Sequence, residues 1–143
     1  MPYPDAPYRM CDILYVRETW YKDPSRYMYR ADYSDTEKFY RDGKEIEMKW
    51  HPSLHMPKEA ARIWLKVTDV RVEQLQDITI DDIRREGLSS VAVHAGDMEI
   101  ALEEWKMLWN YTIKKPDIDR YGWDASPWVL VIEFERCKKP KGV

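Results

Sequence analysis

The stretch from Arg62 to Glu73 limits the possible folds of this chain more than any other. It reads Arg-Ile-Trp-Leu-Lys-Val-Thr-Asp-Val-Arg-Val-Glu. In its first half every second residue, Ile63, Leu65 and Val67, is aliphatic, and in a strand these three share one face. This period of two is typical of a strand with one buried face. After Asp69 the alternation changes phase, because Val70 and Val72 now carry the apolar positions. A one-residue slip predicts a bulge or a sharp bend, which small closed barrels need.

Shorter stretches also have the features of strands. Ile13–Glu18 is apolar at its start, and Tyr27–Tyr33 alternates between apolar and polar residues. The polar segment Ser34–Glu47 contains Asp42-Gly43, a pair that favours tight turns, so we interpret it as a loop or a hairpin. Trp128–Phe134 is almost entirely apolar. Such a run predicts a central strand that is covered on both faces.

Two helices are predicted after the long strand. Thr79 is a natural N-cap for a short helix with two aspartates in its first turn, and Gly87 ends it. Asp97–Asn110 repeats apolar residues at intervals of three and four, which predicts a longer helix with one buried stripe. Lys114–Pro127 is polar and is interpreted as a loop. We therefore expect residues 1–143 to form one mixed α+β domain, a small bent β-barrel with one short and one longer helix.

The charge of the chain limits its partners. The net charge is −3, which argues against a large non-specific footprint on duplex nucleic acid but is compatible with a site that reads one base or a few nucleotides. The seven Trp and ten Tyr, against two Phe, suit half-exposed surfaces and base stacking. Equally, these rings can fill the core and rim of a small β domain. No run of about 18 apolar residues occurs, so we expect no contact with a membrane interior.

No metal or cofactor is expected. His51 and His55 are four residues apart, but Pro52 disfavours a regular helix there and a third ligand is lacking. Cys11 and Cys137 are far apart and make no metal-binding pair. No glycine-rich phosphate loop or dinucleotide motif occurs. The N-terminus has neither the basic nor the apolar part of a signal peptide, so we expect reduced thiols in a cytoplasm.

Several longer motifs resemble those of a known family. From about Pro7 to Arg136 the chain resembles phage and prophage proteins of the ASCH type, which belong to the PUA-like superfamily of small β-barrels. The motifs that carry the resemblance are Val16-Arg-Glu-Thr-Trp20, Tyr29-Arg-Ala-Asp32, Trp50-His-Pro-Ser-Leu-His-Met-Pro57, Val67-Thr-Asp-Val-Arg-Val72, Leu75-Gln-Asp-Ile78, Glu86-Gly87 and Tyr121-Gly-Trp-Asp-Ala-Ser-Pro-Trp128.

The resemblance implies binding of nucleic acid, usually RNA, or action on a modified base or nucleoside. Some members resemble amidohydrolases that act on an acylated cytidine. In those enzymes a Lys and a Thr come from an N-terminal Gly-Arg-Lys-Thr-type motif, and a Glu comes from the short helix. That Glu corresponds to Glu86, the Lys and Thr have no counterpart in this chain, and Cys11 stands where the family usually has Gly. We expect the barrel to be open on one edge unless another chain supplies the missing segment.

The residues and the resemblance together predict one ligand pocket. An Arg beside a Trp can clamp a phosphate and stack a base, and an Asp can accept a hydrogen bond from a cytosine amino group. The binding candidates are Arg17, Glu18, Trp20, Trp50, His55, Arg62, Tyr121, Trp123 and Asp124, with Glu86 as acid or base. As alternatives, Arg17 pairs with Glu18 or Asp69, Trp20 closes the end of the barrel, and the loop tryptophans are buried anchors.

Three functions remain open at this point. The leading hypothesis is a phage or prophage domain that binds single-stranded nucleic acid, above all RNA, or a modified base. The second is hydrolysis of an N-acylated cytidine, with Glu86 in the reaction. The third is a phage assembly or interaction protein without an enzymatic role, which the acidic pI of about 5.7 favours. The expected partners are therefore single-stranded nucleic acid or a nucleoside.

Overall fold

The phase change at Asp69 coincides with a division of the structure. The computed structural model describes residues 5–143. Its contacts gather into two compact units, one formed by Pro7–Asp69 with Glu133–Val143 and the other by Val70–Ile132 with Asp5 and Ala6. We call the first the strand unit and the second the helical unit. The chain as a whole is mixed α+β, which confirms the predicted fold class.

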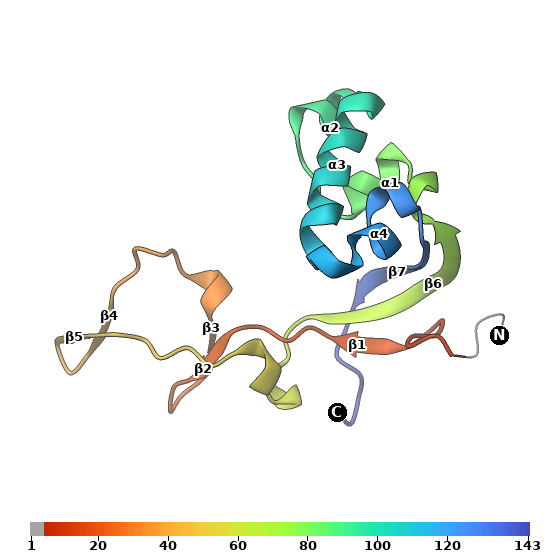
Figure 1. Cartoon of the computed structure of the whole chain (residues 1–143). Coiled ribbons are helices and arrows are strands. Elements are labelled where there is room, and N and C mark those ends of the chain that lie inside the picture. The colour runs from red at the N-terminus through yellow and green to blue at the C-terminus, as the bar shows by residue number, and fades with distance from the viewer. Residues whose placement is uncertain (1–4) are drawn as a thin grey trace. The chain divides into compact units, whose positions relative to one another are not determined.

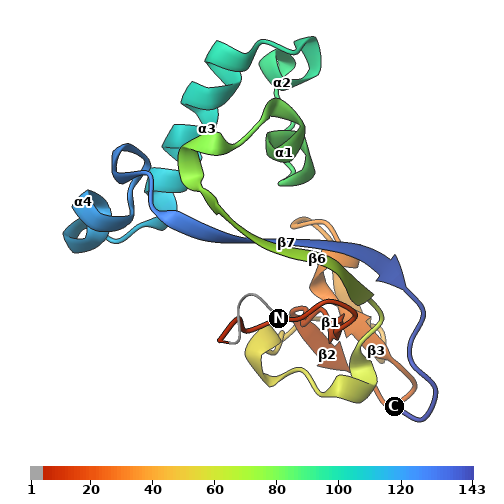
Figure 2. The same ribbon diagram turned by 90° about the vertical axis from the view of Figure 1, so that its right-hand side faces the viewer.

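The largest sheet has three strands in the order β1-β6-β7 (Figure 2). Its strands are β1 (Ile13–Tyr15), β6 (Trp64–Gln74) and β7 (Trp128–Cys137). β1 pairs antiparallel with β6, which places Leu14 opposite Leu65. With 11 residues, β6 is the long strand that the alternating sequence predicts.

The prediction that Trp128–Phe134 is a central strand is wrong. β7 lies at the end of its sheet, and β6 is the central strand. Trp128 is 70 % exposed and Phe134 is 57 % exposed, whereas Val129–Ile132 are half-buried. A run of apolar residues shows that the strand is hydrophobic but carries no signal for how many neighbours it has.

The strand unit also contains two antiparallel hairpins. Asp42 and Gly43 have φ of 51° and 75°, the left-handed values of a two-residue hairpin turn, so the segment predicted as a loop or hairpin is a hairpin. The hairpin strands are β2 (Trp20–Lys22) with β3 (Tyr27–Tyr29), and β4 (Phe39–Arg41) with β5 (Lys44–Ile46). These sheets are separate, and the residues described form no closed barrel, so the predicted barrel is not confirmed.

The core of the strand unit is aromatic and small. Met56, Ala60, Ala61 and Trp64 are buried, and half-buried tyrosines and Trp20 pack around them. Cys11, just before β1, has a left-handed φ of 69° while its N–H donates to the carbonyl of Val67. The side chains of Ala60 and Ala61 are small, so the indole of Trp64 lies against the backbone, where its Nε1–H donates to the carbonyl of Ala61.

The helical unit contains all four α-helices (Figure 1). Thr79 and Asp82 form a capping box at the start of α1, and Asp97 caps α3 through the N–H of Ile100. Both helices therefore begin where the sequence predicts. The helices are α1 (Ile80–Arg85), α2 (Val91–Ala95), α3 (Met98–Thr112) and α4 (Ile118–Tyr121), and their buried core is Ile83, Val93, Ala101 and Trp105.

Helix α4 lies in the segment predicted as a loop, and α2 lies between the two predicted helices, where the sequence predicts no regular element. Each spans five residues or fewer, too short for an apolar repeat to be recognised. The N-cap Ser90 and the left-handed Gly96 nevertheless bound α2 in the usual way. Among the residues described, no helix is long and apolar enough to cross a membrane.

Candidate functional site

The helical unit encloses a small apolar cavity of about 140 Å³, which we call the indole pocket. Trp105 and Trp109 of α3 form one wall, and Val129–Ile132 of β7 contribute aliphatic side chains. The remaining lining residues are Glu73, Gln74, Leu75, Ile78, Asp82 and Glu86. Spacing of four along α3 places both indoles on the same side of the helix. Glu86, which is predicted as a site residue, thus lines the same pocket as two tryptophans from the apolar stripe of the longer helix.

The three carboxylates of the indole pocket are held differently. Arg71 Nε lies 2.5 Å from Glu73 Oε1, and Arg71 Nη2 lies 3.9 Å from Asp82 Oδ1. Glu86 is the C-cap residue of α1, held by its N–H to the carbonyl of Asp82 at 2.9 Å. Its carboxylate makes no hydrogen bond or ion pair with the residues described in the structure. Glu86 therefore keeps its acceptor oxygens available.

Asp82 is kept ionised although it is half-buried. Burial alone raises the pKa of Asp82, but its side chain accepts hydrogen bonds from the hydroxyl and N–H of Thr79 at 2.7 and 3.0 Å. With the charges of Arg71 and Arg85 nearby, these bonds hold the pKa of Asp82 below its ordinary value. Asp82 thus serves the start of α1, and Glu86 is the carboxylate left for a ligand.

The two indoles of the pocket also differ in their polar atoms. The rings are 6.4 Å apart between centroids and inclined by 36°. Trp109 Nε1–H donates to the carbonyl of Tyr121 at 2.9 Å, which fixes this ring. Trp105 is only 7 % exposed, and its Nε1–H has no partner among the described residues. A buried donor without an acceptor costs stability and marks a place where a ligand can supply one.

Three other predicted residues belong to the same unit but do not line the indole pocket. Trp123 packs against the helical core, and its N–H donates to Asn110 Oδ1 at 2.9 Å. Asp124 lies 3.7 Å from Lys106 Nζ. Tyr121 contributes its carbonyl to Trp109. Trp123 and Asp124 share a separate surface hollow with Asn110, so the structure brings them to each other and not to Glu86.

In the strand unit, Arg62 and Glu18 lie together in an ion cluster that we call the Arg62 cluster. Arg62 donates to both carboxylate oxygens of Glu18 at 2.9 and 2.7 Å and to both oxygens of Asp32 at 2.7 and 2.9 Å. Its guanidinium carbon lies 3.9 Å from the centroid of the Tyr29 ring. The hydrogen bonds from Arg62 lower the pKa of Asp32, and those to Glu18 and then Asp32 raise the pKa of Arg62. Two carboxylates already balance this cation.

The remaining predicted residues of the strand unit are spread over its surface and core. Arg17 Nη1 donates to the carbonyl of Leu54 at 3.2 Å. Trp20 packs against the ring of His51, with centroids 4.8 Å apart, and Trp50 packs against tyrosine and phenylalanine rings. His55 is exposed at the end of a short 3₁₀ turn. A single pocket that joins Arg17, Trp20, Trp50 and Arg62 with Glu86 and Trp123 stays a prediction, because the first four residues belong to one unit and the last two to the other.

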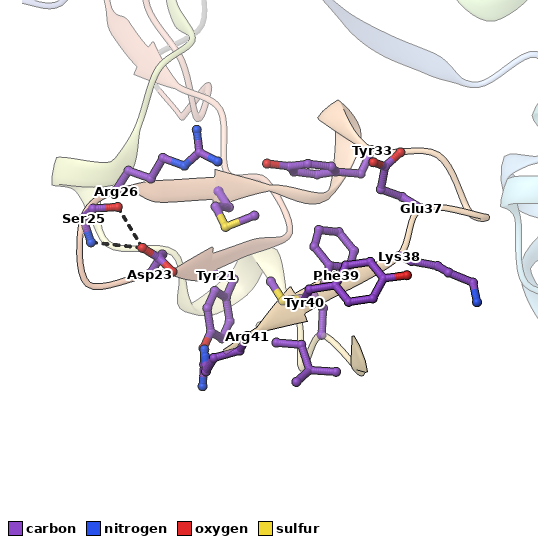
Figure 3. Close-up of a pocket in the computed structure, with 13 residues that line it drawn as sticks. Tyr21, Asp23, Ser25, Arg26, Tyr33, Glu37, Lys38, Phe39, Tyr40 and Arg41 are labelled. Carbon is purple, nitrogen blue, oxygen red and sulfur yellow. Dashed lines mark hydrogen bonds between the residues drawn. The ribbon is translucent and has the colours of Figure 1, made fainter. Parts of the chain in front are cut away.

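The strand unit has an open groove of about 600 Å³ between its two hairpins (Figure 3). Tyr21 and Arg41 lie at one end, where Arg41 Nη2 donates to the Tyr21 hydroxyl at 3.0 Å. Tyr33, Phe39 and Tyr40 lie at the other. Sequence reasoning missed this groove because its residues come together only after both hairpins form. The groove is more open than the indole pocket, and charged side chains of both signs line it.

Sequence reasoning also missed Trp105 and Trp109 as site residues. Their positions in an apolar stripe at intervals of three and four are explained by core packing alone. The available signal was the density of indoles, since one turn of α3 carries two of the seven tryptophans. No protein-family model, curated protein or solved structure matches this chain.

Proposed function

We propose that this protein binds one unpaired nucleobase in the indole pocket, either as a free nucleoside or within single-stranded RNA. The observation that carries the proposal is the unpaired Glu86 carboxylate in a cavity that is walled by two indoles and by the aliphatic side chains of β7. Aromatic side chains stack on nucleobases, and a carboxylate accepts a hydrogen bond from an exocyclic amino group. A phage or prophage origin belongs to the same proposal and rests on the sequence resemblance.

The size of the pocket supports a single pyrimidine ring. Its volume of about 140 Å³ is close to the roughly 150 Å³ of an engineered apolar cavity that holds one benzene ring. Pockets for larger ligands usually measure about 300–1,000 Å³. The sugar and any phosphates therefore remain outside, where the protein contributes little to their binding.

The polarity of the pocket supports cytosine over uracil. Its rim has three carboxylates, of which Glu73 and Asp82 share the charge of Arg71. Glu86, which has no such cation, offers an acceptor to the cytosine amino group. Uracil presents a carbonyl at the same place, which a carboxylate disfavours.

The test is a binding titration of the whole protein with cytidine, uridine and a short oligocytidine, followed calorimetrically. We expect cytidine and oligocytidine to bind, and uridine to bind about tenfold more weakly. Glu86→Gln should reduce the preference for cytidine. Glu99→Gln, an exposed position on α3 outside the pocket, is the matched control. Equal binding of cytidine and uridine, or no effect of Glu86→Gln, contradicts the proposal.

Hydrolysis of an N-acylated cytidine is the second candidate function. It is favoured by the position of Glu86 beside apolar walls, where a carboxyl group can act as general acid or base. The assay follows release of the acyl group from N-acylated cytidine by the wild type and by Glu86→Gln. Turnover that disappears in Glu86→Gln supports this role, and turnover that survives excludes it.

A further inference from the structure

Helix α3 has a second apolar stripe on the side that faces away from the core. Ile100 is 51 % exposed, Met107 is 73 % exposed and Tyr111 is 88 % exposed. Successive residues of a helix turn by about 100°, so Met107 and Tyr111, seven and eleven positions after Ile100, each point within about 20° of its direction. The buried Ala101 and Trp105 lie on the other side of the helix. A helix that is apolar on two faces is typical of one that is covered on both.

The stripe continues onto the neighbouring helix. Val91 at the start of α2 is 88 % exposed, and Leu108, at the border between the exposed face of α3 and its buried face, is 44 % exposed. The hydroxyl of Ser90 donates to the carboxylate of Glu104 at 2.5 Å, which places the start of α2 next to the exposed face of α3. Glu103 and Glu104 separate Ile100 from Met107 along this face, so its apolar part is centred on Met107 and Tyr111, which are four residues apart. Isolated exposed apolar side chains are ordinary, whereas neighbouring ones mark an interaction surface.

We propose that this surface pairs α3 with the α3 of a second copy of the chain, in antiparallel orientation and centred on Met107. The charges along the helix select this occupant. Glu99 and Glu103 are exposed in its first half, whereas Lys114 and Lys115 are exposed just after its end. Antiparallel pairing places the acidic half of each helix over the basic end of the other, and parallel pairing places like charges together.

Centring on Met107 also gives a self-complementary two-fold contact. Met107 then meets its own symmetry mate, and Glu103 lies within one turn of the second copy's Tyr111 and Lys114. The helix has 15 residues, a length of about 22 Å. Because one helix face buries less than the roughly 1,200 Å² of a standard interface, the dimer is expected to be weak, with a dissociation constant of about 10–100 µM.

Sedimentation equilibrium of the whole chain over about 1 µM to 1 mM tests the association. We expect a monomer–dimer equilibrium that Met107→Glu weakens at least about tenfold and that Met107→Leu leaves within about threefold. Glu103→Lys and Lys114→Glu should each weaken it, and the double variant should recover most of the loss. A monomer throughout the range, or a dimer that Met107→Glu does not affect, overturns the proposal.

Disulfide trapping tests the orientation independently of affinity. In a Cys11→Ser, Cys137→Ser background, which removes the two free thiols of the described chain, single Met107→Cys, Ile100→Cys and Tyr111→Cys variants are oxidised. Antiparallel pairing predicts rapid dimer formation by Met107→Cys alone, since only this position meets itself. Comparable trapping at all three positions indicates parallel pairing and overturns the proposal, as does trapping at none.

Discussion

The Arg62 cluster and the indole pocket treat their polar groups in opposite ways. Arg62 is held by two carboxylates and lies over an aromatic ring, so every charge in the cluster has a partner. In the indole pocket, the exposed Glu86 carboxylate and the buried Trp105 Nε1–H both lack partners among the residues described. The first arrangement joins segments of the chain, and the second leaves binding groups available to a ligand.

The largest expected effect comes from truncating a residue that belongs to both the core and the site of the helical unit. Trp105→Ala should reduce the free energy of unfolding by about 3–5 kcal/mol, because it removes a buried indole. Trp105→Phe keeps one aromatic ring and removes the unpaired N–H with part of the indole, so it should cost less stability than Trp105→Ala while weakening cytidine binding. Denaturant unfolding and calorimetric titration measure the two quantities. If Trp105→Phe binds cytidine as well as the wild type, the orphan donor has no part in recognition.

A smaller effect is expected from the Arg62 cluster, and it depends on pH. Arg62→Met should reduce the free energy of unfolding by about 1–2 kcal/mol, since the cluster is partly exposed, and should leave cytidine binding unchanged. The lowered pKa of Asp32 means that its stabilising contribution is complete above the ordinary value of 3.8 and is lost as the pH falls through the lowered pKa. Unfolding measured between pH 7 and pH 2 should therefore show a smaller loss of stability below pH 3.8 for Arg62→Met. If the wild type and Arg62→Met lose the same free energy of unfolding as the pH falls, the titration of Asp32 does not depend on Arg62.

The smallest effect on stability is expected at Glu86. Glu86→Gln should change the free energy of unfolding by less than about 0.5 kcal/mol, because this carboxylate has no partner to lose among the described residues. If the same variant also loses its preference for cytidine, Glu86 contributes to ligand binding and not to the stability of the fold. A large destabilisation would instead give Glu86 a structural role like that of Arg62.

Local signals in the sequence account for the parts of the fold that could be predicted. The caps Thr79 and Asp97 and the turn Asp42-Gly43 each act within a few residues, and the structure contains all three. The neighbours of β7 and the joining of Glu86 with Trp105 depend on contacts between distant segments, which a pattern along the chain does not encode. For the same reason, Glu86 could be proposed from sequence, whereas the indoles beside it could not.

The backbone at Cys11 has a consequence for engineering this protein. A φ of 69° is a conformation that glycine adopts freely and that costs other residues roughly 1–2 kcal/mol. Replacing Cys11 by Gly should therefore stabilise the folded chain at this position. The gain is reduced by the greater conformational freedom of glycine in the unfolded chain. The same change removes an exposed thiol. It would make the protein more resistant both to heat and to oxidative cross-linking during handling.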